Sequence, residues 1–154
     1  MKKSLFFFVF LVASLASCET PFANQIEFHR ESNSEFKIIT LQQAYERVIT
    51  NPSSSIITLG DVGCGNCDVF KSEAPNFVKD KSISLFYVEL NSVTVSAEDI
   101  EMLKAITTFN DPARTYEYPY GGVPTTYVFS SEALLIAFAG NNIKTLRRMI
   151  KVVD

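Results

Sequence analysis

Residues 56–67 read IITLGDVGCGNC, an apolar run that leads directly into two cysteines separated by two residues. Ile56–Leu59 is short, apolar and rich in β-branched side chains, which predicts a buried strand. Glycine-rich sequence follows it, and the pattern from about Cys64 to Asp80 predicts a helix. Both cysteines are therefore expected where a strand ends and a helix begins.

That placement favours sulfur chemistry. The unpaired amides and positive dipole end of a helix N-terminus stabilise a thiolate, and can lower a thiol pKa from about 8.5 to roughly 3.5–7.5. The spacing puts Cys67 one helical turn after Cys64, close enough to attack a mixed disulfide formed there. Gly63 and Gly65 leave the first sulfur uncovered, so the backbone of another protein can approach it. The pair is predicted to exchange thiols and disulfides.

The sequence offers little support for a metal-binding or hydrolytic role of the pair. Zinc normally takes four ligands, and the chain offers these two thiolates plus His29, its single histidine. Copper carriers and Cys-His hydrolases need a downstream histidine, which the sequence lacks. A purely structural disulfide remains an open alternative in an oxidising compartment. We expect no metal and no organic cofactor.

The elements around the cysteines alternate between strands and helices. The expected order is βαβαβαββα, a single α/β domain over residues 35–154 with a mixed five-stranded central sheet and helices on both faces. The expected strands are 36–39, 56–59, 84–90, 123–129 and 134–139, and the last two are close enough in the chain to pair as an antiparallel hairpin at the edge of the sheet. The expected helices begin near 40 and 96, at the capping residues Thr40 and Ser96, and near 64 and 143. The last helix has apolar residues at helical spacing as far as Val153.

The first 17 residues predict a secretory signal peptide. Two lysines precede an apolar run of about a dozen residues, too short for the roughly 20 that a membrane-spanning helix needs. Leu15–Cys18 resembles a bacterial lipobox, in which the cysteine becomes the new N-terminus and carries lipid with acyl chains such as palmitate. Residues 18–34 lack a sustained period, which predicts a flexible tether. The protein is thus expected in the cell envelope, extracytoplasmic and lipid-anchored to a membrane through Cys18.

The net negative charge of the chain argues against nucleic acid as a partner. Loss of Lys2 and Lys3 with the leader moves the formal net charge from −3 to about −5. Nucleic-acid binding requires a cationic face, so nucleic acid is not an expected partner. We expect a monomer that meets substrate proteins bearing disulfides or thiols, and a redox partner protein.

The sequence resembles the thioredoxin-like superfamily over about residues 35–154. The likeness rests on the element order, on the CxxC at Cys64–Cys67 and on Val123-Pro124-Thr125 before a late strand. It implies that Pro124 is a cis proline beside the cysteines and that Val123 offers backbone hydrogen bonds to a substrate polypeptide. Gly63 stands where the family usually has a Trp, and because it leaves the Cys64 sulfur uncovered it is predicted to lie in the substrate-binding region. A narrower likeness is to the bacteriocin-transport accessory proteins.

The sequence departs from the thioredoxin pattern in ways that bear on mechanism. Thr58 occupies the place of the buried acid that thioredoxins carry six residues before the first cysteine. Glu89 on the third expected strand is our candidate for the missing proton-transfer group, and Asp61 is the second choice; a solvated charge is the alternative for both. Three tyrosines at alternate positions precede Pro124, and Tyr120 among them is predicted to line the substrate groove or to pack under a loop (Tyr116, Tyr118, Tyr120).

Two functions follow from these features. The first is an extracytoplasmic, membrane-anchored thiol-disulfide oxidoreductase in which Cys64 attacks and Cys67 resolves. The alternative is a non-catalytic accessory lipoprotein that binds a partner through the face from Tyr116 to Pro124 and keeps a structural disulfide.

Overall fold

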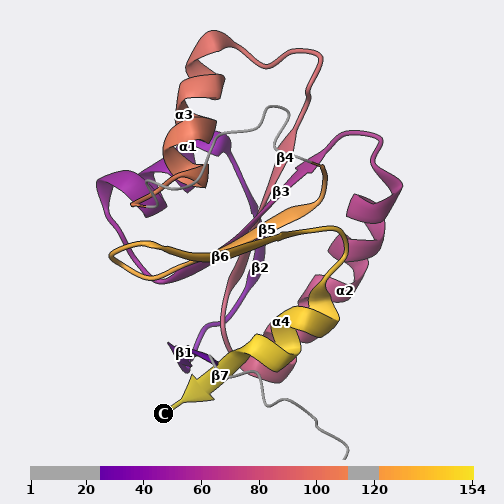
Figure 1. Ribbon diagram of the computed structural model, residues 1–154. Coiled ribbons are helices and arrows are strands. Elements are labelled where there is room, and N and C mark those ends of the chain that lie inside the picture. The colour runs from indigo at the N-terminus through magenta and orange to yellow at the C-terminus, as the bar shows by residue number, and fades with distance from the viewer. Residues whose placement is uncertain (1–24, 111–121) are drawn as a thin grey trace, which may run out of the picture.

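The computed structural model describes residues 25–110 and 122–154, which form a central sheet covered by helices on both faces (Figure 1). In chain order the elements are β1 (Ile26–His29), β2 (Phe36–Ile39), α1 (Leu41–Tyr45), the π-helical turn η1 (Glu46–Thr50), β3 (Ser55–Asp61), α2 (Gly65–Lys81), β4 (Leu85–Leu90), α3 (Ala97–Thr107), β5 (Thr125–Phe129), β6 (Leu134–Ala139), α4 (Ile143–Met149) and β7 (Ile150–Val153).

The five-stranded sheet has the order β2-β4-β3-β5-β6. Strands β2, β4 and β3 run parallel, whereas β5 is antiparallel to β3 and forms a hairpin with β6. This confirms the predicted mixed sheet with an antiparallel edge. Strand β3 lies at its centre and is buried from Ser55 to Gly60, because helices cover both of its faces.

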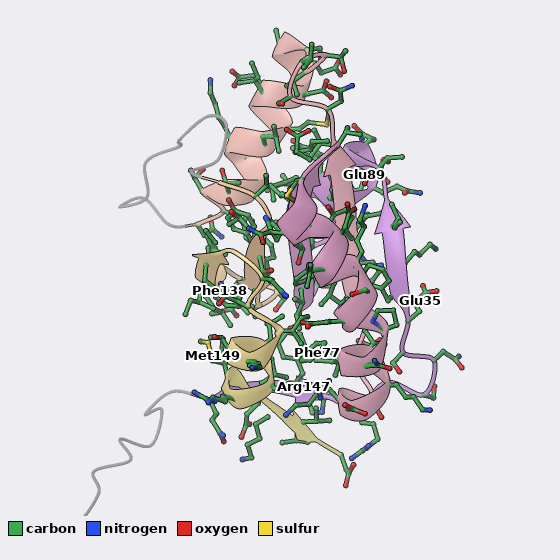
Figure 2. The ribbon with its side chains drawn as sticks, turned by 90° about the vertical axis from the view of Figure 1, so that its right-hand side faces the viewer. Glu35, Phe77, Glu89, Phe138, Arg147 and Met149 are labelled. Carbon is green, nitrogen blue, oxygen red and sulfur yellow. A yellow bond between two sulfur atoms is a disulfide. The ribbon has the colours of Figure 1, made fainter. Side chains whose placement is uncertain are left out.

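Two apolar clusters fill the space on the two sides of the sheet. One joins α1, η1 and α3 to the side chains of Ile57, Leu59 and Val88. The other joins α2 and α4 to Ile56 and Tyr87, and it includes Cys67. Figure 2 shows Phe77 of α2 next to Arg147 of α4, whose guanidinium lies 5.8 Å from the ring centroid. The second cluster therefore places the cysteine-bearing helix against the sheet.

The helix starts follow from local capping. Thr40 accepts a hydrogen bond from the Gln43 amide at 3.1 Å, and the Gln43 side chain accepts one from the Thr40 amide at 3.0 Å. Ser96 and Asp99 form the same reciprocal arrangement before α3. Each capping box satisfies backbone amides that would otherwise lack a partner, which fixes where the helix begins.

Both ends of the described chain differ from the sequence-based expectation. The tether prediction for residues 18–34 is wrong for Ile26–His29, and the last helix, expected to continue to Val153, ends at Met149. Ile150–Val153 instead pairs in parallel with Ile26–His29 as a separate two-stranded sheet. Phe28 is 5% exposed and packs into the α2 side of the core. Pairing and burial between distant segments thus outweigh local polarity at one end and helical periodicity at the other.

Phe28→Ala is expected to lower the free energy of unfolding by about 2 kcal/mol, because the ring would leave the core of the α2 side. Denaturant unfolding monitored by circular dichroism measures this. Glu27→Ala on the same strand is the control; it removes only an exposed ion pair with Lys151 and should have a smaller effect. A Phe28→Ala protein as stable as the control would mean that β1 is a dispensable tether after all.

Candidate active site

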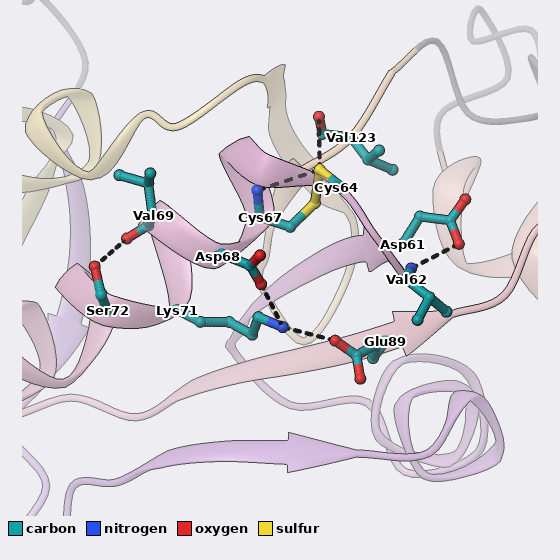
Figure 3. Close-up of polar contacts among 10 residues, drawn as sticks. All are labelled: Asp61, Val62, Cys64, Cys67, Asp68, Val69, Lys71, Ser72, Glu89 and Val123. Carbon is teal, nitrogen blue, oxygen red and sulfur yellow. Dashed lines mark hydrogen bonds and ion pairs between the residues drawn. A yellow bond between two sulfur atoms is a disulfide. The ribbon is translucent and has the colours of Figure 1, made fainter.

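The two cysteines form a disulfide at the N-terminus of α2, with an S–S distance of 2.17 Å (Figure 3). Cys64 is the N-cap residue of the helix and is partly exposed, whereas Cys67 is fully buried. The Cys67 amide donates a hydrogen bond to Cys64 Sγ at 3.2 Å. The predicted strand-to-helix junction is confirmed, and it gives the two sulfurs different access to solvent.

The sulfur of Cys64 faces the segment that leads into β5. The Val123–Pro124 peptide bond is cis, as the family resemblance implied, and Pro124 is buried. Cys64 Sγ lies 3.6 Å from the carbonyl oxygen of Val123. Gly63 has a φ of +77° and is exposed, with open space where a Cβ would stand. The fold therefore brings Gly63, Val123 and Pro124 to the exposed sulfur.

Glu89 belongs to a group of three charged side chains from α2 and β4. Its carboxylate is partly exposed and forms an ion pair with Lys71 Nζ at 2.7 Å, and Lys71 also lies 3.1 Å from Asp68 (Figure 3). Hydrogen bonds to Glu89 and Asp68 raise the pKa of Lys71, so the amine stays a cation. Lys71 thus links Asp68, the residue after Cys67, to Glu89. The role of Glu89 in proton transfer stays a prediction.

Asp61, the second candidate for proton transfer, anchors two loops. Its carboxylate accepts hydrogen bonds from the amides of Val62 at 2.8 Å and Ser92 at 3.1 Å. Partial burial alone would raise the pKa of Asp61, but the hydrogen bonds from Ser92 and Val62 outweigh it and hold that pKa below its usual value. A carboxylate of this kind is a weak base, so the geometry favours an anchoring role.

Asp61→Asn is expected to destabilise the protein at neutral pH and to matter less in acid. A lowered pKa in the folded state adds stability above the unfolded pKa of about 3.9, and that stability is lost as the pH falls through the folded pKa. The difference between wild type and variant should therefore shrink below about pH 4. Thermal unfolding across the pH range measures it, with the exposed Glu132→Gln as control. A difference that does not change with pH would contradict the anchoring role.

Thr58, at the place of the thioredoxin acid, is fully buried, and its hydroxyl lies 2.9 Å from that of Thr126. Nothing acidic occupies that point of the sheet. Tyr120, with Tyr116 and Tyr118, lies outside the described residues, and so does Cys18. Among the residues that the structure describes, no group of three or more His, Cys, Asp or Glu is placed to hold a metal ion.

Sequence reasoning missed three residues of this region: Lys71, Gly60 and Tyr87. Lys71 follows Cys67 by four positions, a spacing that puts both on one side of a helix. A glycine inside a central strand often marks the close approach of another group, and a Cβ on Gly60 would stand 1.7 Å from the Tyr87 hydroxyl oxygen. The spacing of Lys71 and the glycine at position 60 are both visible in the sequence. Neither shows which side chain lies next to it, because that depends on the packing of the folded chain.

Solved structures of similar shape identify the fold. Thioredoxin O2 from Arabidopsis thaliana in the oxidised state gives a TM-score of 0.50 at 14% sequence identity, over 76% of this chain and 92% of that chain. A chain from work on the thiol-resolving mechanism in yeast mitochondrial 1-Cys peroxiredoxin via glutathione/thioredoxin systems gives 0.50 at 12% identity, over 74% and 92%. The chain has a thioredoxin-like fold, as the resemblance implied. No protein-family model and no curated protein sequence matches it.

Proposed function

We propose that this protein is a thiol-disulfide oxidoreductase that acts on disulfides or thiols of other proteins. The observation that carries the proposal is the asymmetric pair at the start of α2. Cys64 is partly exposed, Cys67 is fully buried, and the exposed sulfur lies 3.6 Å from the carbonyl oxygen before a cis proline. An accessible sulfur can meet a substrate, and a buried neighbour can then resolve the adduct without competing for it.

The reaction requires only the two sulfurs and a substrate. When the protein acts as reductant, the Cys64 thiolate attacks a substrate disulfide, which forms a mixed disulfide and releases one substrate thiolate. Cys67 then loses its proton and attacks Cys64 Sγ, which closes the Cys64–Cys67 bond and releases the second substrate thiolate. Two electrons pass to the substrate, and the reverse sequence oxidises a dithiol. The amide of Cys67 and the helix dipole favour the thiolate of Cys64.

The surroundings of Cys64 suit an extended polypeptide. Gly63 leaves open space beside the sulfur, and the backbone of Val123 lies next to it at an irregular segment before β5. Val62 and Val69 are 58% and 46% exposed on the two sides of the CxxC. We propose that a substrate segment lies across Gly63 and Val123 and covers these apolar side chains. A redox partner protein would meet the same surface to restore the starting state.

Equilibration with glutathione tests the function. The protein is incubated in glutathione buffers of graded oxidation, and the fraction of Cys64–Cys67 disulfide is measured by mass spectrometry after trapping free thiols. A redox-active pair should show a reversible midpoint within reach of the glutathione couple. A disulfide that stays closed at every ratio of reduced to oxidised glutathione would indicate a structural bond and would sink the proposal.

A non-catalytic accessory lipoprotein remains the second candidate, and closure of the disulfide in this structure is compatible with it. The double change Cys64→Ser and Cys67→Ser separates the two. Normal folding with loss of the cellular phenotype favours chemistry, whereas an intact phenotype favours binding.

We further propose that the protein is an envelope lipoprotein, anchored through Cys18 on the extracytoplasmic side of a membrane. The leader pattern of residues 1–17 and the lipobox-like Leu15–Cys18 support this. Within residues 25–110 and 122–154, no helix combines the length and apolar character that crossing a membrane requires. Cys18→Ala should release the protein from the membrane fraction while thiol exchange persists. Retention in the membrane would overturn the anchor.

A further inference from the structure

The hydroxyl of Tyr87 is a buried polar group without a hydrogen-bond partner among the described residues. The whole side chain is fully buried on the α2 side of the sheet. A buried donor that makes no hydrogen bond costs free energy, and native structures hold few of them. Tyr87 therefore carries a buried hydroxyl whose hydrogen-bonding capacity no described residue satisfies in the oxidised protein.

The position of this hydroxyl connects it with the cysteines. Tyr87 of β4 pairs with Thr58 of β3, and its ring reaches along β3 until the oxygen lies over Gly60, four residues before Cys64. Phe70 stacks on the ring with centroids 6.2 Å apart. Phe70 lies one helical turn after Cys67, and both belong with Tyr87 to a single buried cluster. The hydroxyl thus lies in the layer between α2 and the sheet that also contains the buried sulfur.

Burial, assisted by nearby carboxylates, keeps the Tyr87 phenol protonated. Burial raises the pKa of Tyr87 most, and the carboxylates of Glu89, Asp68 and Asp61 raise it further, while Lys71 opposes them. Lys71 comes from α2 and lies 5.6 Å from the ring centroid. At neutral pH the phenol therefore carries a proton that it can donate, in a region where the closed disulfide provides no charged acceptor.

Opening the disulfide creates such an acceptor. Cys67 becomes a buried thiol, and it must ionise before it can attack. We propose that, once the Cys64–Cys67 bond is open, Tyr87 donates a hydrogen bond to the sulfur of Cys67 and stabilises its thiolate for the resolving step. Tyr87 keeps its own proton throughout. The proton of Cys67 goes to solvent, and the sulfur then bonds to Cys64 Sγ while the bond between Cys64 and the substrate sulfur breaks and the substrate thiolate leaves. Tyr87 is a positioning residue acting through Cys67, and this role rests on the proposed function.

Tyr87→Phe tests the role of the hydroxyl while the ring is kept. Glutathione is attached to Cys64, and its release by Cys67 is followed at a series of pH values. The variant should resolve about tenfold more slowly at pH 7, and the midpoint of its pH profile should rise by about one unit. The oxidised variant should be as stable as wild type or more so, because an unpaired hydroxyl has been removed. Tyr127→Phe, at a buried tyrosine in the cluster on the opposite face, should leave the pH profile unchanged.

A second measurement does not depend on exchange activity. In a Cys64→Ser background, the Cβ chemical shift of Cys67 reports its ionisation, and Tyr87→Phe should move that transition to higher pH. An unchanged transition and an unchanged rate of glutathione release would overturn the role of Tyr87. Equal destabilisation of the oxidised and reduced forms with the same pH profile would also overturn it, since the hydroxyl would then be structural. Failure of the wild type to release glutathione would instead count against the proposed function.

Discussion

Cys64→Ser is expected to lower the rate of disulfide exchange by at least about 1,000-fold, because the serine hydroxyl is not ionised at neutral pH and cannot replace a thiolate nucleophile. Reduction of a small aromatic disulfide, followed by the colour of the released thiol, measures the rate. Cys18→Ser is the matched control, because it removes the remaining cysteine of the chain and should leave the rate unchanged.

The partner change, Cys67→Ser, should behave differently. Cys64 can still attack, but the resolving sulfur is gone, so a mixed disulfide with the substrate should accumulate. Mass spectrometry under non-reducing conditions detects the adduct at Cys64. Both variants lose the same disulfide, so its contribution to stability is absent from both, and a difference between them reflects the chemistry of the two sulfurs. Adducts of equal yield in the two variants, or in neither, would contradict the assignment of attacking and resolving roles.

Gly60→Ala is expected to lower the free energy of unfolding by about 3 kcal/mol, at the upper end of overpacking effects. The new Cβ would stand 1.7 Å from the Tyr87 hydroxyl oxygen and 2.4 Å from its Cζ. Neither the backbone of Gly60 nor the ring of Tyr87 can move away easily. Gly60 lies on β3 between β4 and β5, and the Tyr87 ring is in contact with Phe70.

Chemical denaturation of the oxidised protein measures this loss. Gly65→Ala is the matched control, since a Cβ there would meet nothing within 4 Å. Combining Gly60→Ala with Tyr87→Leu, which removes the outer ring atoms, should cost less than the sum of the two single changes. Additive losses would mean that the clash with Tyr87 is not the cause, and a Gly60→Ala protein of wild-type stability would contradict the packing.

Most elements of the central fold could be predicted from short-range patterns in the sequence. The apolar run at Ile56–Leu59 predicted the central strand, and the capping sequences at Thr40 and Ser96 predicted two helix starts that the structure confirms. The hairpin of β5 and β6 was also foreseeable, because two apolar runs lie close together in the chain. In each case the signal lies within a few residues of the element that it specifies.

Local sequence patterns gave the wrong secondary structure where two segments far apart in the chain pair with each other. Residues 150–153 continue the helical spacing of apolar side chains, yet they form a strand because Ile26–His29 pairs with them. Neither segment indicates the other, since the pairing joins the two ends of the described chain. The proton-transfer candidates show the same limit. The charge of Glu89 and its place on a strand make it a candidate from the sequence alone, but its ion pair with Lys71 depends on how α2 packs on β4.

The resemblance to a thioredoxin-like α/β fold rested on the element order over residues 35–154 together with the CxxC and Val123-Pro124-Thr125. The place of the two sulfurs could be predicted from the sequence, because strand, turn and helix-start signals are local. Tertiary packing decided which cysteine is exposed, which groups surround the buried one, and that Tyr87 fills the space left by Gly60. Burial and close contact are properties of surfaces that meet only after folding. The place of the two sulfurs is therefore visible in the order of residues, whereas their surroundings arise from the packing of α2 on the sheet.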